Sequence, residues 1–224
     1  MKTLQKFGGF AALYAGIAYI VGMIGFLLVV GWPEDPAQQV AVLANNQVSQ
    51  HILYIIVYQV WAVFLVILTL ALYERLKAVS PAMMQTVTAI GIIWATVVIA
   101  SGMIFNIGMD NVVHLYGKDP AQAVTVWRVI ASVCDGLGGG NEILGGVWML
   151  LISWVALRAG GLPKALNYLG IVVGAAGILS ALPGLGELRL IFGLVQIVWF
   201  IWLGIGMLRS NPGKKATNEL LSAA

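Results

Sequence analysis

Six long apolar stretches, separated by short segments that carry nearly all of the charge, constrain this chain more than any other feature. An apolar run of about 20 residues is long enough, as a helix, to cross a hydrocarbon core about 30 Å thick. Lipid offers no hydrogen-bond partner to the backbone, so such a run must satisfy its own peptide groups as a helix. The runs are Phe10–Val30, Ile52–Tyr73, Met83–Met109, Ile143–Leu157, Leu166–Leu182 and Leu190–Leu208. They predict an all-α polytopic membrane protein, one domain over residues 1–224, with six transmembrane helices in three hairpins.

The composition agrees with a membrane location. The chain is 60% hydrophobic and 9% charged, with a mean hydropathy of +0.94, whereas about 25% of the residues of an ordinary soluble domain are charged. The net charge is +3, but the cations lie at the ends of apolar runs, where they meet anionic lipid headgroups. We therefore expect the lipid bilayer as a partner and no nucleic acid.

The distribution of lysine and arginine predicts the orientation, because basic residues are enriched in cytoplasmic loops. Six spans place both termini on the same side of the membrane. The basic residues on that side are Lys2, Lys6, Arg75, Lys77, Arg158, Lys164, Arg209, Lys214 and Lys215, and those on the other side are Lys118, Arg128 and Arg189. This asymmetry predicts that both termini are cytoplasmic.

Two of the outer loops share a motif. The residues Asp35-Pro36-Ala37-Gln38 recur as Asp119-Pro120-Ala121-Gln122. Asp is a good N-cap and Pro suits the first helical position, so each motif predicts a helix start. We expect amphipathic outer helices before spans two and four, arising either from an internal repeat or from two independent caps. The second of these, Pro120–Leu137, can be interfacial, re-entrant or a lid over the bundle.

The candidate site is a group of polar residues near the outer ends of the spans. Charge inside a bilayer is expensive and therefore points to function. The candidate ligand-binding residues are Glu142, Asp135, Arg128, Asn141, Asn106 and His51. Glu142 is the strongest candidate, because it begins the fourth span next to glycines and apolar residues. Two interpretations remain open: a ligand pocket, or a face solvated by headgroups in which Arg128 pairs with Glu142.

The sequence indicates no metal and no cofactor. His51 and His114 are the only histidines, and they lack the spacing of a zinc or haem site. No Gly-x-Ser-x-Gly nucleophile elbow occurs, and Gly138-Gly139-Gly140 is not followed by the Lys-Ser/Thr pair of a phosphate-binding loop. No residue is therefore assigned as catalytic.

The last 85 residues resemble a known family. The run from Gly161 to Gly170, Gly-Leu-Pro-Lys-Ala-Leu-Asn-Tyr-Leu-Gly, precedes a glycine-rich fifth span, and the last span carries Trp199, Trp202 and Gly204. These features are similar to those of an uncharacterised bacterial six-span family, domain of unknown function 4386. The resemblance implies a location in the bacterial cytoplasmic (inner) membrane and supplies no catalytic residues.

Three functional hypotheses follow from the sequence. The leading one is a non-enzymatic multi-pass protein that binds a small ligand or lipid, or an accessory subunit that meets partner membrane subunits or forms a homo-oligomer. Its support is that the sequence contains no complete catalytic set. The alternatives are a small-solute transporter or channel, and an intramembrane enzyme that uses Asp135 or Glu142 as an acid–base group.

Overall fold

The protein is helical throughout the part of the chain that the structure describes. The computed structural model describes residues 2–26, 31–139, 142–160 and 162–209, and these contain no strand. The α-helices are α1 (Lys2–Ile24), α2 (Pro36–Asn45), α3 (Gln47–Tyr54), α4 (Trp61–Leu76), α5 (Pro81–Tyr116), α6 (Pro120–Cys134), α7 (Ile143–Ala159), α8 (Lys164–Leu179) and α9 (Leu188–Arg209), with π-helical segments η2 (Ile55–Val60) and η3 (Asp135–Gly139). The all-α prediction is confirmed for these residues.

Five helical stretches among the described residues are long and apolar enough to cross a membrane. They are Thr3–Ile24, Gln47–Leu76, Pro81–Tyr116, Pro120–Ala159 (interrupted by the undescribed residues 140–141) and Leu188–Arg209. The remaining apolar helix, α8, has 16 residues, which is about 24 Å at 1.5 Å per residue and less than a hydrocarbon core of about 30 Å. A membrane-protein architecture is therefore supported, and the number of six spans stays a prediction.

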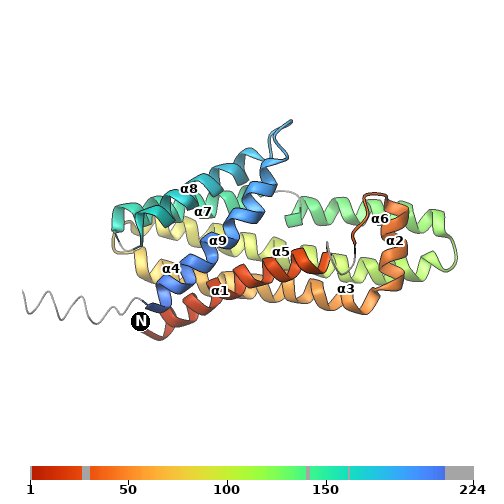
Figure 1. The fold of residues 1–224 in the computed structure, drawn as a ribbon, viewed down its shortest axis with the longest axis horizontal. Coiled ribbons are helices and arrows are strands. Elements are labelled where there is room, and N and C mark those ends of the chain that lie inside the picture. Colours follow the sequence, from red (N-terminus) through yellow and green to blue (C-terminus); the bar gives the residue numbers. More distant parts are fainter. Residues whose placement is uncertain (1, 27–30, 140–141, 161, 210–224) are drawn as a thin grey trace, which may run out of the picture.

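Six helices pack against one another in the order of the sequence. Helix α1 packs on α4, α4 on α5, α5 on α7, α7 on α8, α8 on α9, and α9 returns to α1 (Figure 1). The two ends of this series therefore meet, so the first and last helices enclose the bundle together. Helices α1 and α9 are therefore neighbours in the fold, although they are at opposite ends of the sequence.

Aromatic side chains fill the centre of this bundle. Ring centroids lie 5.1 Å apart for Trp61 and Trp94, 5.8 Å for Trp94 and Trp148, and 6.0 Å for Trp148 and Trp199. Phe200 closes the circle, at 5.4 Å from Trp199 and 6.3 Å from Trp61. Most of these pairs are edge-to-face, the arrangement that aromatic quadrupoles favour. We call these five residues the aromatic ring; they tie α4, α5, α7 and α9 together.

Helices α7 and α8 contact each other through glycines. A Cβ atom at Gly146 would lie 2.7 Å from the carbonyl oxygen of Gly174, and one at Gly174 would lie 2.7 Å from the carbonyl oxygen of Gly146. The two backbones touch, and neither position has room for a side chain. Small residues allow this close packing in membrane bundles, where dispersion contacts replace the hydrophobic effect.

A second core lies at one end of the molecule. Helix α5 has 36 residues, about 54 Å, so it extends well beyond the thickness of a hydrocarbon core. Around its C-terminal half pack α2, α3 and α6 (Figure 1), with a separate buried cluster that includes Leu43, Phe105 and Trp127. We call this part the distal lobe. Helix α6 packs along α5.

Both Asp-Pro motifs begin helices, as predicted. Asp35 is the N-cap of α2 and its side chain accepts a hydrogen bond from the backbone N–H of Ala37, and Asp119 is the N-cap of α6 and accepts from Gln122. The first bond is 3.4 Å long and the second 3.0 Å. The helix starts are confirmed, while an origin of the two motifs by duplication stays a prediction.

Replacing either cap should destabilise the distal lobe locally. We expect Asp119→Ala to cost about 1 kcal/mol, the usual loss for an N-cap, and Asp35→Ala to cost less because its hydrogen bond is longer. Hydrogen exchange of the first-turn amides of α2 and α6 measures both effects. Unchanged exchange rates in α6 of the Asp119→Ala protein would contradict the capping role.

The glycine contact between α7 and α8 makes a second prediction. Gly174→Ala should lower the free energy of unfolding by about 1–3 kcal/mol, the usual cost of overpacking, because the new methyl group meets backbone atoms. Gly206→Ala in α9 is the matched control, since a Cβ there has no neighbour within 4 Å. Thermal unfolding in detergent compares the two, and equal midpoints would show that the helices separate without cost.

Candidate functional site

A cavity of about 460 Å³ lies between α1, the α3–α4 segment, α5 and α9, at the end of the bundle nearest the distal lobe. Its walls are mainly apolar and aromatic. The lining residues are Tyr19, Gly22, Met23, Phe26, Val57, Tyr58, Trp61, Trp94, Val98, Gly138, Glu142, Arg189, Leu190, Gly193, Leu194 and Ile197. The lining thus contains one acidic and one basic side chain.

The π-helical segment η2 and the kinked segment η3 border this cavity. Segment η2 contributes Val57 and Tyr58, and η3 contributes Gly138. A π turn shifts the register of a helix and leaves backbone groups without their usual α-helical partners. In η2 the carbonyl oxygen of Ile56 accepts a hydrogen bond of 2.9 Å from the Tyr14 hydroxyl of α1. Segment η3 contains a kink, because the backbone of Gly138 has φ 166° and ψ 9°, which is not helical.

The aromatic ring forms one wall. Trp61 and Trp94 belong both to the ring and to the cavity lining, and Tyr19 packs edge-on against Trp61 at 5.7 Å. The ring holds these side chains in place, because each indole is fixed by at least one further aromatic neighbour. The cavity therefore has a rigid aromatic wall on the α4–α5 side.

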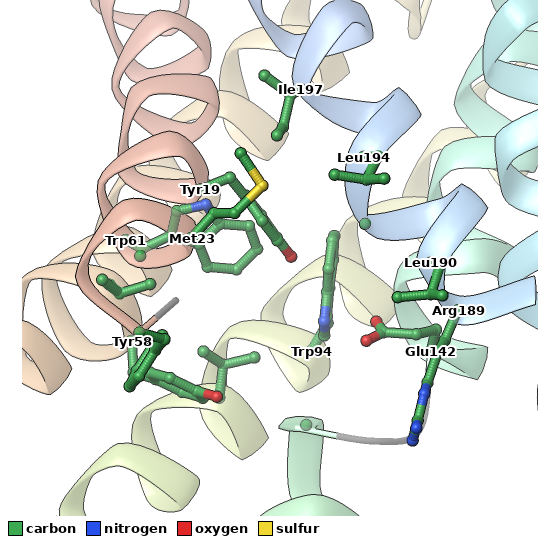
Figure 2. Close-up of a pocket in the computed structure, with 16 residues that line it drawn as sticks. Tyr19, Met23, Tyr58, Trp61, Trp94, Glu142, Arg189, Leu190, Leu194 and Ile197 are labelled. Carbon is green, nitrogen blue, oxygen red and sulfur yellow. The ribbon is translucent and has the colours of Figure 1, made fainter. Parts of the chain in front are cut away.

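The polar groups of the cavity come from four different elements. Figure 2 shows the Glu142 carboxylate pointing into the cavity beside the Trp94 indole, with Arg189 extending along its edge. The hydroxyl groups of Tyr19 and Tyr58 also lie on the lining (Figure 2). Together they offer a carboxylate that accepts hydrogen bonds, a guanidinium that donates them, and hydroxyls that do either. This set suits the polar end of a largely apolar molecule.

The structure separates the predicted site residues. Glu142 lines the cavity, at the N-terminus of α7, and Asn141 lies outside the described residues. Asp135 and Arg128 are exposed and do not belong to the cavity lining. The basic residue that shares the cavity with Glu142 is Arg189, at the start of α9.

Two further predicted residues lie in or next to the distal lobe. Asn106 is buried in α5, 4% exposed, and its side-chain oxygen has no hydrogen-bond partner among the residues that the structure describes. His51 of α3 lies with Nδ1 3.8 Å from Asp110 Oδ1, which also accepts a 2.8 Å hydrogen bond from the side-chain amide of Gln47. The contacts of His51 and Gln47 with Asp110 link α3 to α5. Neither Asn106 nor His51 lines the cavity. The predicted set is therefore spread over two regions.

The candidate binding residues predicted from the sequence do not include Arg189, Trp94 and Tyr58. Arg189 was one of only three basic residues on the predicted outer side, which is a signal for it, but its partner depends on how α9 packs. Trp94 is a large aromatic residue within a long apolar run and carries no local signal of a cavity. Tyr58 is four residues from Tyr54, a spacing equally typical of packing between helices.

The two histidines lie at separate places, His51 beside Asp110 and His114 beside Lys118. Among the described residues, no group of three or more His, Cys, Asp or Glu side chains could hold a metal ion. The side chain of His114 lies 2.9 Å from Lys118 Nζ on the surface of α5.

The fold and cavity define a helical, membrane-type protein with an apolar site that has charged groups at one edge. The chain belongs to the family described as domain of unknown function (DUF4386), whose model matches residues 9–206. The match is not restricted to the last 85 residues, on which the resemblance was first based. No curated protein and no solved structure matches the chain.

Proposed function

We propose that this protein is a non-enzymatic membrane protein that holds an amphiphilic small molecule in the cavity between α1, α5 and α9. The apolar part of the ligand would lie among Met23, Trp94 and Leu194, and its polar end would meet Glu142 and Arg189. The observation that carries the proposal is the lining itself, in which a single carboxylate and a single guanidinium stand at the edge of an otherwise mainly apolar cavity.

The size and chemistry of the cavity support this proposal. Small-molecule sites occupy about 300–1,000 Å³, have mainly hydrophobic and aromatic walls and contain few polar groups. The present cavity, at about 460 Å³, has these properties. Opposite charges at its edge reduce the cost of placing each one near lipid. They also give a ligand one anionic and one cationic contact, so that the ligand is oriented as well as retained.

The proposed orientation of the protein in the membrane follows from its apolar runs and its basic residues. We place the protein in the bacterial cytoplasmic (inner) membrane, with six spans, both termini cytoplasmic, and the distal lobe on the outer side. The sixth span would be α8, whose shortness a locally thinned bilayer or its flanking residues can accommodate. The cavity then lies in the outer half of the bundle. In that membrane it would meet partner subunits or form a homo-oligomer.

Retention of a co-purifying ligand tests the function. We expect native mass spectrometry in mild detergent to show a bound amphiphile on the wild-type protein. Glu142→Gln or Arg189→Gln should reduce its occupancy by about tenfold or more, since a hydrogen bond to a charged group contributes about 1.5–3 kcal/mol. Arg128→Gln is the matched control, because Arg128 is an exposed arginine outside the cavity.

Equal losses in all three variants would indicate a general effect of charge on the membrane protein rather than a site. A wild-type protein that carries no amphiphile, even after incubation with lipid extract, would contradict the proposed function. Thermal unfolding of the empty variants separates a binding effect from misfolding, because the proposal expects them to fold.

The two ends of α5 test the orientation. With Cys134 replaced by alanine, a cysteine at Gly117 should react with an impermeant thiol reagent in intact cells, and a cysteine at Ser80 should react only after lysis. These residues flank the same helix, at its C-terminal and N-terminal ends. Labelling of the Ser80 position in intact cells would reverse the proposed topology.

A further inference from the structure

Helices α1 and α9 contact each other closely at one end of their crossing. A Cβ at Gly9 would lie 3.2 Å from the carbonyl oxygen of Gly204, and one at Gly204 would lie 2.8 Å from the carbonyl oxygen of Gly9. Further along, a Cβ at Gly16 would lie 2.8 Å from Ile201 Cγ1 and 3.3 Å from the carbonyl oxygen of Ile197. The backbones are thus in near contact over the part of α1 from Gly9 to Gly16.

The same two helices separate towards their other ends. Figure 1 shows α1 and α9 side by side near the N-terminus and diverging as α9 runs towards α8. Gly22 of α1 faces Val57 rather than α9, and a Cβ at Gly193 of α9 would have no neighbour within 4 Å in the described part of the chain. Both glycines line the cavity. The cavity therefore occupies the space where the two helices part.

Apolar side chains flank this opening on the outside of the bundle. Met23 of α1 is 39% exposed, and Leu190 and Leu194 of α9 are 55% and 52% exposed, yet all three line the cavity. A side chain that is exposed and lines a cavity lies at its mouth. Since both helices are candidate membrane spans, the environment that meets an apolar mouth of this kind is the hydrocarbon of the bilayer.

We propose that the occupant is a membrane phospholipid, one acyl chain of which enters the cavity sideways between α1 and α9. This inference rests on the proposed function and names its ligand class and route. Arg189, in the first turn of α9, would hold the phosphate, because a guanidinium binds phosphate oxygens in a bidentate manner. Glu142 would accept hydrogen bonds from the hydroxyl or ammonium group of the headgroup. The chain would lie against Trp94 and Met23.

Gly193 provides a way to block the route without disturbing the fold. A larger residue there would extend into open space at the mouth, and Gly206 on the same helix is equally unobstructed but does not line the cavity. Gly193→Leu and Gly206→Leu change helix propensity by the same amount. They differ only in whether the new side chain occupies the mouth.

The experiment uses the full-length protein in phosphatidylethanolamine and phosphatidylglycerol vesicles that contain a phospholipid with a diazirine near the end of one acyl chain. After illumination, cross-linked peptides are mapped by mass spectrometry. We expect wild type and Gly206→Leu to cross-link at the α5 segment around Trp94. Gly193→Leu should reduce this product about tenfold or more, the ratio that about 1.4 kcal/mol produces, and Gly193→Ala should have an intermediate effect.

A variant blocked after folding provides a second test. In a Cys134→Ala background, Gly193→Cys is modified in the folded protein with methanethiosulfonate reagents of increasing size, and the Trp94 cross-link should decrease with size. Cross-linking only to exposed positions such as Val198, or a Trp94 product that neither Gly193→Leu nor the reagents reduce, would overturn lateral entry. If a water-soluble amphiphile is retained at Glu142 and Arg189 under those conditions, the proposed function stands and only the inference fails. Absence of any bound amphiphile contradicts both.

Discussion

The packing of five aromatic rings at the centre of the bundle determines how the other helices are placed. Trp61, Trp94, Trp148, Trp199 and Phe200 come from four helices, and each ring contacts two others of the set. Such large side chains keep helix axes apart, whereas the glycine contacts between α7 and α8 and between α1 and α9 bring backbones together. The cavity forms where α1 and α9 are beyond their glycine contacts but still face the aromatic ring.

The helix starts and the apolar helices could be predicted from the sequence, because they depend on residues that are close together in the chain. The two Asp-Pro motifs act through a side chain that caps amides two or three residues away, so their effect does not depend on the tertiary structure. The apolar runs were equally informative, because a helix is the structure that satisfies the backbone in lipid. The apolar runs predicted the ends of the helices less well. Helix α1 begins at Lys2 rather than near Phe10, because a helix continues past the end of its apolar run when nothing in the sequence stops it.

The composition of the site could not be predicted in the same way. Glu142 was selected because a carboxylate at the start of a span is costly, and it does line the cavity. Its expected neighbour Arg128 is in α6, which packs along α5 and lies outside the lining. Asp135 is in η3, which borders the cavity through Gly138, but its side chain is exposed and is not part of the lining. Arg189 is 47 positions from Glu142 and reaches the cavity because α9 returns to α1. Pairing across such a distance depends on crossing angles, which no pattern in one sequence specifies.

The size of the cavity also bears on whether it is ever empty. The cavity of about 460 Å³ is open between α1 and α9, where Met23, Leu190 and Leu194 are exposed, so its apolar lining contacts whatever surrounds the bundle there. The helices could close the void only by approaching each other, but Trp61 and Trp94 hold α4 and α5 in place on one side and Tyr19 packs against Trp61 on the other. An acyl chain restores the missing dispersion contacts without moving any helix. A bilayer supplies such chains at high concentration, so the rigid aromatic wall that creates the space also favours its occupation.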